Sequence, residues 1–323
     1  MSPKRRSNQI SIPQKQRFSP TDFGPKSLDE AIHLFLRECK IRNLRQDTLI
    51  YYKKELDFSA KLLRNNDAPE DPNKITASDI NDSIILFMMD QKLKETTINT
   101  RLRAVRTLFN FLDRKGFLEN NPMKEVKLLR NTKRIVETFT RDQIRTLFAQ
   151  PDQETFTGMR DYTLMMLFLE TGVRLNEMAN IKVDDIKWQD GVIYIRHPKT
   201  QSHRSVPIQL IMKKQLSKYV QLRGQLNHDF LFVNIDNEPM LRQNMQQSVR
   251  KYGRMACILN VRCSPHTFRH TFAKMCVQNG ADVFTLQTIL GHSTMDMVRH
   301  YVNLYSNDLT ERHRKFSPIQ DIY

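Results

Sequence analysis

The stretch "SPHTFRH" (residues 264–270) predicts the start of a helix that carries two phosphate-binding side chains in its first turn. Ser264 suits the N-cap and Pro265 suits the first helical position. His266 and Arg269 follow three residues apart, so they share one face of the helix. Because a helix N-terminus presents free N–H groups and the positive end of its dipole, this face suits an anion.

A second stretch, "LGHSTMDMVRHY" (residues 290–301), predicts the end of one helix, a sharp turn and the start of another. Gly291 suits a left-handed C-cap and Ser293 suits the next N-cap. His292 then falls in the turn and Tyr301 on the second helix. Each residue alone is more often a packing or surface residue. Taken with the first stretch, they support the hypothesis that one phosphate is bound here and that Tyr301 attacks it.

Composition favours a nucleic-acid partner. The chain has 323 residues, with 51 Lys and Arg against 35 Asp and Glu, a net charge of +16. Such a charge attracts polyanions, and phosphate neutralisation releases counterions from DNA. A basic surface without a partner is the alternative. No apolar run is long enough to span a bilayer and no secretory signal is present, so we expect no membrane partner and a cytoplasmic, nucleoid-associated, prokaryotic or phage-encoded protein.

The sequence offers no site for a metal or a nucleotide cofactor. The four cysteines have no metal-ligand spacing, and no Gly-rich phosphate loop is found among the nine glycines. We also find no carboxylate cluster suited to two metal ions. We therefore expect no cofactor and no metal. Arginines can offset the charge of a phosphate instead, and an ester between tyrosine and phosphate stores the energy of the broken bond for rejoining.

Helical periodicity and composition divide the chain into five parts. Ser27 with Glu30 predicts the first helix start, a second helix starts near Asp47, and Ser78 or Asp79 caps a third. A fourth amphipathic helix ends at Gly116. The expected parts are a basic flexible tail at 1–26, a helical DNA-binding bundle at 27–118, a linker at 119–137, a catalytic domain at 138–310 and a C-terminal tail at 311–323.

The catalytic part is predicted to be helical with a small hairpin. Thr140 caps a helix with Gln143, and a buried helix follows at 161–170. "VIYIR" (192–196) alternates like a strand, and "SVPI" (205–208) is its expected partner. The fold class is therefore mainly α with a small antiparallel β-sheet (α+β).

The motifs in this order resemble the tyrosine recombinase (phage integrase) family. The resemblance rests on "TGVRLNE" (171–177), a lysine before "RSVP" (204–207), H-x-x-R at 266–269, L-G-H at 290–292 and Tyr301. It covers essentially residues 27–305 and the combined motif is highly specific. Because 26 residues precede the first helix, the resemblance is to the simple two-domain type without an arm-binding domain.

The resemblance implies a role for each matching residue. Tyr301 would attack the scissile phosphate, Lys199 would protonate the leaving 5′ hydroxyl, and His266 would act as base or hold the proton of the nucleophile. Pro198 and Thr200 flank Lys199 where the family often has glycine, which makes this assignment the least secure. Lys182 and Lys187 precede the hairpin and are less suitable.

Four further residues would bind or organise the phosphate, according to the same resemblance. Arg174 and Arg269 would clamp its non-bridging oxygens, and His292 would donate to it. Glu177 lies one helical turn from Arg174 and would orient the site; the alternative is a simple surface acid. Outside this set, basic residues that could contact DNA, or be no more than a solvated face, are Arg101, Arg103, Arg106, Lys133, Arg134 and Arg204.

The resemblance implies a site-specific recombinase that cleaves and rejoins duplex DNA through a 3′-phosphotyrosine intermediate and a Holliday junction. It would act as a homotetramer on two DNA sites, with a possible accessory DNA-bending or directionality factor. The basic tail and the Asn and Lys content favour a mobile element or prophage. The alternatives are a non-catalytic DNA-binding regulator with the same fold, Xer-like chromosome dimer resolution, and a type IB topoisomerase.

Overall fold

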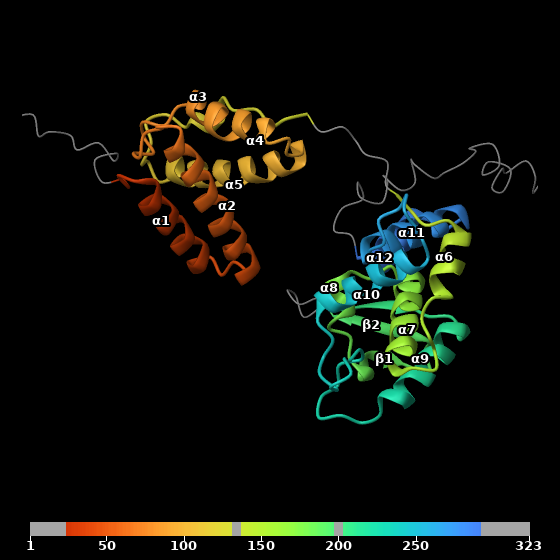
Figure 1. Ribbon diagram of the computed structural model, residues 1–323. Coiled ribbons are helices and arrows are strands. Elements are labelled where there is room, and N and C mark those ends of the chain that lie inside the picture. The colour runs from red at the N-terminus through yellow and green to blue at the C-terminus, as the bar shows by residue number, and fades with distance from the viewer. Residues whose placement is uncertain (1–23, 131–136, 197–202, 292–323) are drawn as a thin grey trace, which may run out of the picture. The chain divides into compact units, whose positions relative to one another are not determined.

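The computed structural model describes residues 24–130, 137–196 and 203–291, and the chain divides into two compact units, 1–134 and 135–323 (Figure 1). Each unit is described by itself. Both are mainly helical, and the second contains a small antiparallel sheet, so the predicted fold class is confirmed. Within the described residues, no helix combines the length and the apolar character needed to cross a membrane.

The first unit is a bundle around one apolar core. One helical rod is continuous through a π-helical turn, η2, which separates α3 from α4. The amphipathic stripe of α5 supplies much of the core, with Ile98, Leu102 and Phe109 fully buried. The elements are α1 (Leu28–Ile41), α2 (Gln46–Asn65), α3 (Ala77–Ile80), η2 (Asn81–Leu86), α4 (Phe87–Asp90), α5 (Glu95–Arg114) and η3 (Pro122–Lys124).

The sequence correctly predicted the N-cap of α1 but not that of α3. The Ser27 hydroxyl caps α1 by accepting from the N–H of Glu30, as predicted. The third helix is capped by Thr76, so the prediction of Ser78 or Asp79 was wrong. The Thr76 hydroxyl accepts from the N–H of Asp79, and the Asp79 carboxylate accepts from the N–H of Thr76 at 2.8 Å. Asp79 is therefore the N3 residue of a capping box that begins at Thr76.

The first unit extends past residue 118, where the bundle was predicted to end. Met123 and Val126 are buried in its core. The side chain of Asn99 forms two hydrogen bonds with the backbone of Leu129, at 2.9 Å and 2.8 Å. The first part of the predicted linker therefore packs on α5.

The second unit surrounds the buried helix α7 (Figure 1). The antiparallel pairing of β2 with β3 was predicted; the short strand β1, which completes the order β1-β2-β3, was not. The elements are α6 (Arg141–Phe148), α7 (Phe156–Thr171), α8 (Leu175–Met178), η4 (Val183–Asp185), β1 (Ile186–Lys187), β2 (Val192–Arg196), β3 (His203–Pro207), α9 (Leu210–Arg223), α10 (Arg242–Met255), α11 (Pro265–Gln278) and α12 (Val283–Leu290).

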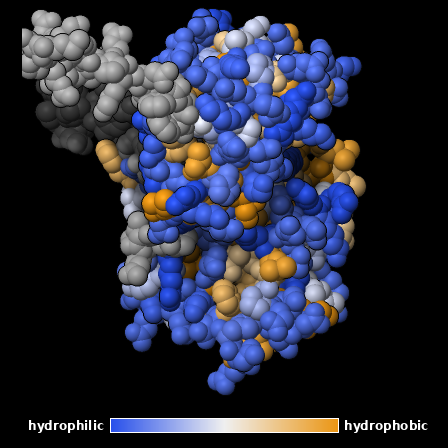
Figure 2. All heavy atoms as spheres, turned by 90° about the vertical axis from the view of Figure 1, so that its left-hand side faces the viewer, coloured by the Kyte–Doolittle hydropathy of each residue, from blue (hydrophilic) through white to orange (hydrophobic). Residues whose placement is uncertain are grey.

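Apolar packing fixes α11 against α7 and thereby places the first predicted motif. Phe268 is fully buried, stacks on Phe168 with ring centroids 6.2 Å apart, and lies 5.1 Å from the Phe139 ring. This orientation of α11 also sets the positions of His266 and Arg269, because they flank Phe268 on the helix. The face seen in Figure 2 is largely hydrophilic with small apolar patches, so the large apolar side chains are mainly inside the units.

Candidate functional site

The turn between α7 and α8 positions Arg174. Gly172 ends α7 with a left-handed φ of +60°, and its N–H donates to the carbonyl of Phe168. A Cβ at this position would lie 2.5 Å from the ring of Phe272 and 2.9 Å from Leu290, so only glycine fits. The tight turn brings Arg174 to the N-cap of α8.

Arg174 reaches the C-terminal end of α12. Its Nη1 donates to Glu177 Oε1 at 3.1 Å, and its Nη2 donates to the carbonyl oxygen of Gly291 at 3.0 Å. The side chain remains about a third exposed, at 36%. A guanidinium that is held at one edge and open at another is suited to bind a phosphate oxygen.

Arg269 converges on the same helix end from α11. Its Nη1 donates to the carbonyl oxygen of Gly172 at 2.6 Å, and its Nη2 donates to that of Leu290 at 2.8 Å. The residue is buried, with 4% of its surface exposed. Three motifs that are far apart in the sequence therefore meet at the last turn of α12, where two guanidinium groups share neighbouring carbonyls.

Glu177 is a buried anion between two arginines, which excludes a simple surface acid. Arg204 Nη1 and Nη2 donate to its two carboxylate oxygens at 3.0 Å and 2.8 Å. Burial on its own raises the pKa of Glu177, but the hydrogen bonds and charge of Arg204, followed by those of Arg174, outweigh burial and lower this pKa to about 2. Glu177 is therefore ionised at neutral pH.

Arg204 was expected on a DNA-facing surface, and the structure places it elsewhere. Its side chain is only 13% exposed, and all three of its nitrogens donate inside the protein, to Glu177 and, from Nε at 2.8 Å, to the carbonyl of Ile289. The guanidinium faces the protein because a buried carboxylate lies opposite it. It was a candidate from its charge alone, and its partner lies 27 residues away in the sequence.

His266 lies in the first turn of α11, as predicted, with Ser264 as N-cap. Its side chain is exposed on the surface beside cationic groups. Partial burial, then the positive charges of Arg269, Arg262 and Arg174, lower the pKa of His266 below its usual 6.5. The imidazole is therefore neutral at pH 7 and can accept a proton.

Five predicted residues lie outside the described part of the chain: Lys133, Arg134, Lys199, His292 and Tyr301. Strand β2 ends at Arg196 and strand β3 begins at His203, so the two strands flank the segment that contains Lys199 in the sequence. The two less suitable lysines are both engaged. Lys182 Nζ lies 3.7 Å from Asp229, and Lys187 Nζ donates to the carbonyl of Asp184.

The three arginines of α5 that were candidates for DNA contact differ in exposure. Arg101 is a correction to the expected solvent-facing set: its Nε donates to Glu55 at 2.8 Å, and its guanidinium lies 3.8 Å from the centre of the Phe58 ring. Arg106 is half-buried and donates to the carbonyl of Val126 at 2.6 Å. Arg103 is exposed. Of the three, Arg103 is the one open to a partner.

Helix α10 presents a basic surface that the sequence analysis missed. Its sequence, "RQNMQQSVRKYGRM", contains four basic residues and no acid. Met245, Val249 and Tyr252 are buried, so the opposite face exposes amide and guanidinium groups. This face borders a groove of about 530 Å³, which is lined by Arg250 and Arg254 of α10 and by Arg262. The absence of acids in an Arg- and Gln-rich helix was the available signal.

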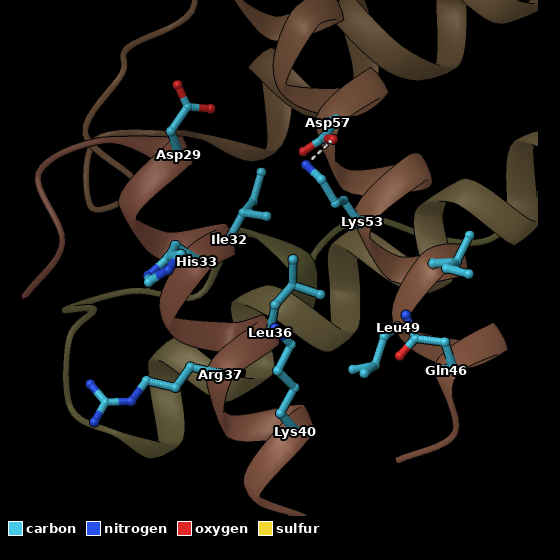
Figure 3. A pocket seen from close by; sticks show the side chains of 11 residues that line it. Asp29, Ile32, His33, Leu36, Arg37, Lys40, Gln46, Leu49, Lys53 and Asp57 are labelled. Carbon is cyan, nitrogen blue, oxygen red and sulfur yellow. Dashed lines mark hydrogen bonds and ion pairs between the residues drawn. The ribbon is translucent and has the colours of Figure 1, made fainter. Parts of the chain in front are cut away.

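The first unit has a groove of about 640 Å³ between α1 and α2 (Figure 3). Both of its acids are already paired, Asp57 with Lys53 and Asp29 with Arg64, each at 2.7 Å. Arg37 and Lys40 lie toward the other end of α1 (Figure 3) and form no ion pair within the described residues. This rim is therefore basic.

Across the described ranges, no cluster of three or more His, Cys, Asp or Glu could hold a metal ion.

Sequence comparison matches both units to known families. The profile described as "Phage integrase family" matches residues 137–308, and that of "Phage integrase, N-terminal SAM-like domain" matches residues 32–116. Tyrosine recombinase XerC of Oceanobacillus iheyensis is 27% identical over 284 residues, 86% of this chain and 92% of the relative. Tyrosine recombinase XerD of Listeria monocytogenes is 24% identical, over 90% of this chain and 98% of the relative.

Solved structures show the same fold at low identity. The integrase of transposon Tn1549, in complex with a circular intermediate DNA, has a TM-score of 0.72 at 20% identity and covers 93% of this chain and 100% of its own. A lambda integrase dimer bound to a COC′ core site has a TM-score of 0.69 at 19% identity, covering 84% of this chain and 97% of its own.

Proposed function

This chain belongs to the phage integrase family and is a tyrosine-type site-specific DNA recombinase, and we propose that it works through a 3′-phosphotyrosine intermediate and a Holliday junction. The observation that supports this most directly is the convergence of Arg174 and Arg269 on the last turn of α12. The chain continues from that turn to His292 and, nine residues further, to Tyr301.

In the proposed reaction the hydroxyl of Tyr301 attacks the scissile phosphorus in line, and the bond from phosphorus to the 5′ oxygen breaks. Lys199 protonates that leaving oxygen, and neutral His266 accepts the proton from Tyr301 or holds it. Attack by a 5′ hydroxyl from the other duplex reverses the step and releases the tyrosine. No bond energy has to be supplied from outside, because one phosphodiester is exchanged for another.

Charge on the reacting phosphate is offset by Arg174 and Arg269, with a hydrogen bond from His292. The supporting feature is the preorganisation of the two guanidinium groups by backbone carbonyls and Glu177. Donors that are fixed before the reaction need no reorganisation when charge develops, which is a large source of rate enhancement.

We propose duplex DNA as the substrate, bound by both units. Supporting surfaces are the basic face of α10, the exposed Arg103, and the basic rim of the groove between α1 and α2. Lys133 and Arg134 remain proposed contacts of the linker. Assembly as a homotetramer on two sites, helped by an accessory DNA-bending or directionality factor, completes the proposal. The protein would act in the cytoplasm, at the nucleoid.

The biological setting has two candidates. The basic N-terminal residues and the Asn and Lys content favour a mobile element or prophage. Resolution of chromosome dimers is favoured by the named relatives, which are XerC and XerD proteins matched over 92% and 98% of their own length. A screen of the source DNA for the cleaved sequence separates the two, because an element end and a chromosomal site differ in location and copy number.

Covalent trapping tests the proposed chemistry. Wild type and Tyr301→Phe are incubated with DNA of the source organism, denatured, and the protein-linked fragments are sequenced. We expect adducts at one defined site with the wild type and none with Tyr301→Phe. Site-specific binding by both proteins without any adduct would overturn the proposed mechanism and favour a DNA-binding regulator.

A further inference from the structure

We infer that Arg204 is a positioning residue that neutralises Glu177 and so keeps the guanidinium of Arg174 available to the substrate phosphate. This inference rests on the proposed function and deepens it. It assigns to Arg204 a role inside the protein in place of a contact with DNA.

Glu177 is bound more fully by Arg204 than by the side chain of Arg174. Both oxygens of Glu177 accept from Arg204, whereas Arg174 uses one nitrogen of its side chain, Nη1, at 3.1 Å to one of them. The second oxygen also accepts from the backbone N–H of Arg174 at 2.8 Å. The bidentate partner of the carboxylate is therefore Arg204, and Arg174 is the side partner that remains partly exposed.

Arg204 also sets the charge balance of the site. With Arg204 present, the three arginines and one glutamate give the site a net charge of two positive units, from Arg174, Arg204 and Arg269 against Glu177. Without Arg204, the buried carboxylate has only Arg174 as an ion-pair partner among the described residues. A buried unpaired charge is costly, so Glu177 would draw Arg174 into a two-pronged pair and away from the phosphate.

The guanidinium of Arg204 also joins β3 to the C-terminal end of α12. Arg204 lies on β3, directly after the segment with Lys199, and its Nε donates to Ile289 on α12, just before His292. Gly291 permits this approach: its φ is +61°, and a Cβ there would lie 2.8 Å from Arg204 Nη1. The glycine of the L-G-H motif therefore leaves room for Arg204.

A rescue experiment distinguishes this role from simple structural support. The proteins are wild type, Arg204→Met, Glu177→Gln, the double variant, and Arg196→Met as a matched control. Arg196, at the end of the neighbouring strand β2, forms an ion pair at 2.7 Å with Asp185 of η4; its own side chain is 61% exposed, whereas that of Asp185 is 3% exposed. Single-turnover adduct formation, DNA affinity and thermal midpoint are measured for each, on the DNA site recovered with wild type.

We expect Arg204→Met to slow adduct formation by about 100-fold, with DNA affinity changed by less than about threefold. Replacing Glu177 by Gln in that background removes the competing charge, so the double variant should recover at least about tenfold. Arg204→Met should also regain activity relative to wild type as the pH falls through the usual range of a glutamate, because protonated Glu177 releases Arg174. Arg196→Met also leaves a buried carboxylate without its ion-pair partner, so it should lower the thermal midpoint, but its adduct formation and pH profile should stay like those of wild type.

A double variant no faster than Arg204→Met, or a pH profile unchanged by Arg204→Met, would overturn the inference. Because Glu177→Gln also removes an unpaired buried charge and can restore stability, rates are compared at a temperature at which the thermal midpoints show every variant to be folded. If Arg204→Met fails to fold, the same cycle is run with Arg204→Gln, which keeps polar atoms but loses the charge; rescue by Glu177→Gln is again required. Absence of an adduct with wild type is a separate result and counts against the proposed function.

Discussion

Arg269 on α11 donates a 2.6 Å hydrogen bond to the carbonyl oxygen of Gly172, 97 residues earlier in the chain. The bond joins the H-x-x-R motif to the T-G-x-R motif through a backbone atom. Gly172 therefore does two things: its left-handed conformation turns the chain toward Arg174, and its carbonyl orients Arg269. The two guanidinium groups are set by one turn.

Gly172→Ala is expected to damage both the fold and the site. The new Cβ would lie 2.5 Å from Phe272 and 2.9 Å from Leu290, and the positive φ adds backbone strain. Overpacking and strain together should lower the free energy of unfolding by about 2–4 kcal/mol. Urea unfolding measures this loss, and adduct formation should fall further than stability alone explains, because the Arg269 carbonyl partner moves.

Gly280→Ala is the control for backbone strain. Gly280 also has a positive φ, +90°, but no atom lies within 4 Å of a Cβ built there. Its substitution should cost only about 1–2 kcal/mol and leave adduct formation intact. Equal effects of the two substitutions on adduct formation would contradict the proposed role of the Gly172 turn.

The proton affinity of His266 should respond to one neighbouring arginine. Partial burial and the charges of Arg269, Arg262 and Arg174 lower its pKa, because protonation would add a further cation to the group. Arg262→Gln removes one of these charges, so the pKa of His266 should rise. NMR titration of the free protein measures the midpoint, which should lie below 6.5 in the wild type.

The same titration has an internal control in Arg254, which lines the groove with Arg262 but does not act on the pKa of His266. Arg254→Gln should leave the midpoint unchanged. If His266 acts as the base, the acid limb of adduct formation should move upward with Arg262→Gln and in parallel with the NMR midpoint. A midpoint at or above 6.5 in the wild type would show that the imidazole is not held neutral.

Local rules predicted much of this fold, since caps, apolar stripes and turn glycines depend on neighbours in the sequence. The C-cap at Gly291 and the N-cap at Ser264 were found in this way. Thr76 was missed although it follows the same rule, because Ser78 and Asp79 offered competing caps within three residues. The family motifs predicted that Arg174 and Arg269 belong to one site, and both reach the end of α12, but they did not predict that Arg204 reaches it too.

Partners that are distant in the sequence were not predictable from charge alone. Arg101 and Arg204 look like surface cations, yet each is opposed by a buried or half-buried carboxylate, Glu55 at a separation of 46 residues and Glu177 at 27. Nothing local marks either pair. The α10 surface differs, because its sequence does carry a local sign of it: four basic residues and no acid in one amphipathic helix. That sign belongs to no catalytic motif, and it was missed.

Arg101 and Arg103 are expected to give opposite results on substitution. The side chains of Arg101 and Glu55 are 11% and 13% exposed, so Arg101→Ala leaves a nearly buried carboxylate unpaired. We expect a loss of about 3–5 kcal/mol, seen as faster hydrogen exchange in α2 and α5 of the full chain. Arg103→Ala should leave exchange unchanged and weaken DNA binding. An unchanged exchange rate in Arg101→Ala would refute a structural role for that ion pair.

The basic face of α10 should contribute to DNA affinity in a salt-dependent way. Arg250 and Arg254 are exposed there, and each phosphate contact adds about 0.9 to the slope of log affinity against log salt concentration. Arg250→Ala and Arg254→Ala together should therefore reduce the slope by up to about 2 and weaken binding of any duplex at low salt. Lys218→Ala is the control, an exposed lysine on α9, which lies at the end of the unit away from α11 and α12 (Figure 1). Fluorescence anisotropy across a salt series measures the slopes.

Because contacts to phosphate carry no sequence information, substitution of the two arginines should weaken binding of cognate and random duplexes equally. A selective loss on the cognate site would instead assign them to base readout. A slope unchanged by the double substitution would remove α10 from the DNA-binding surface.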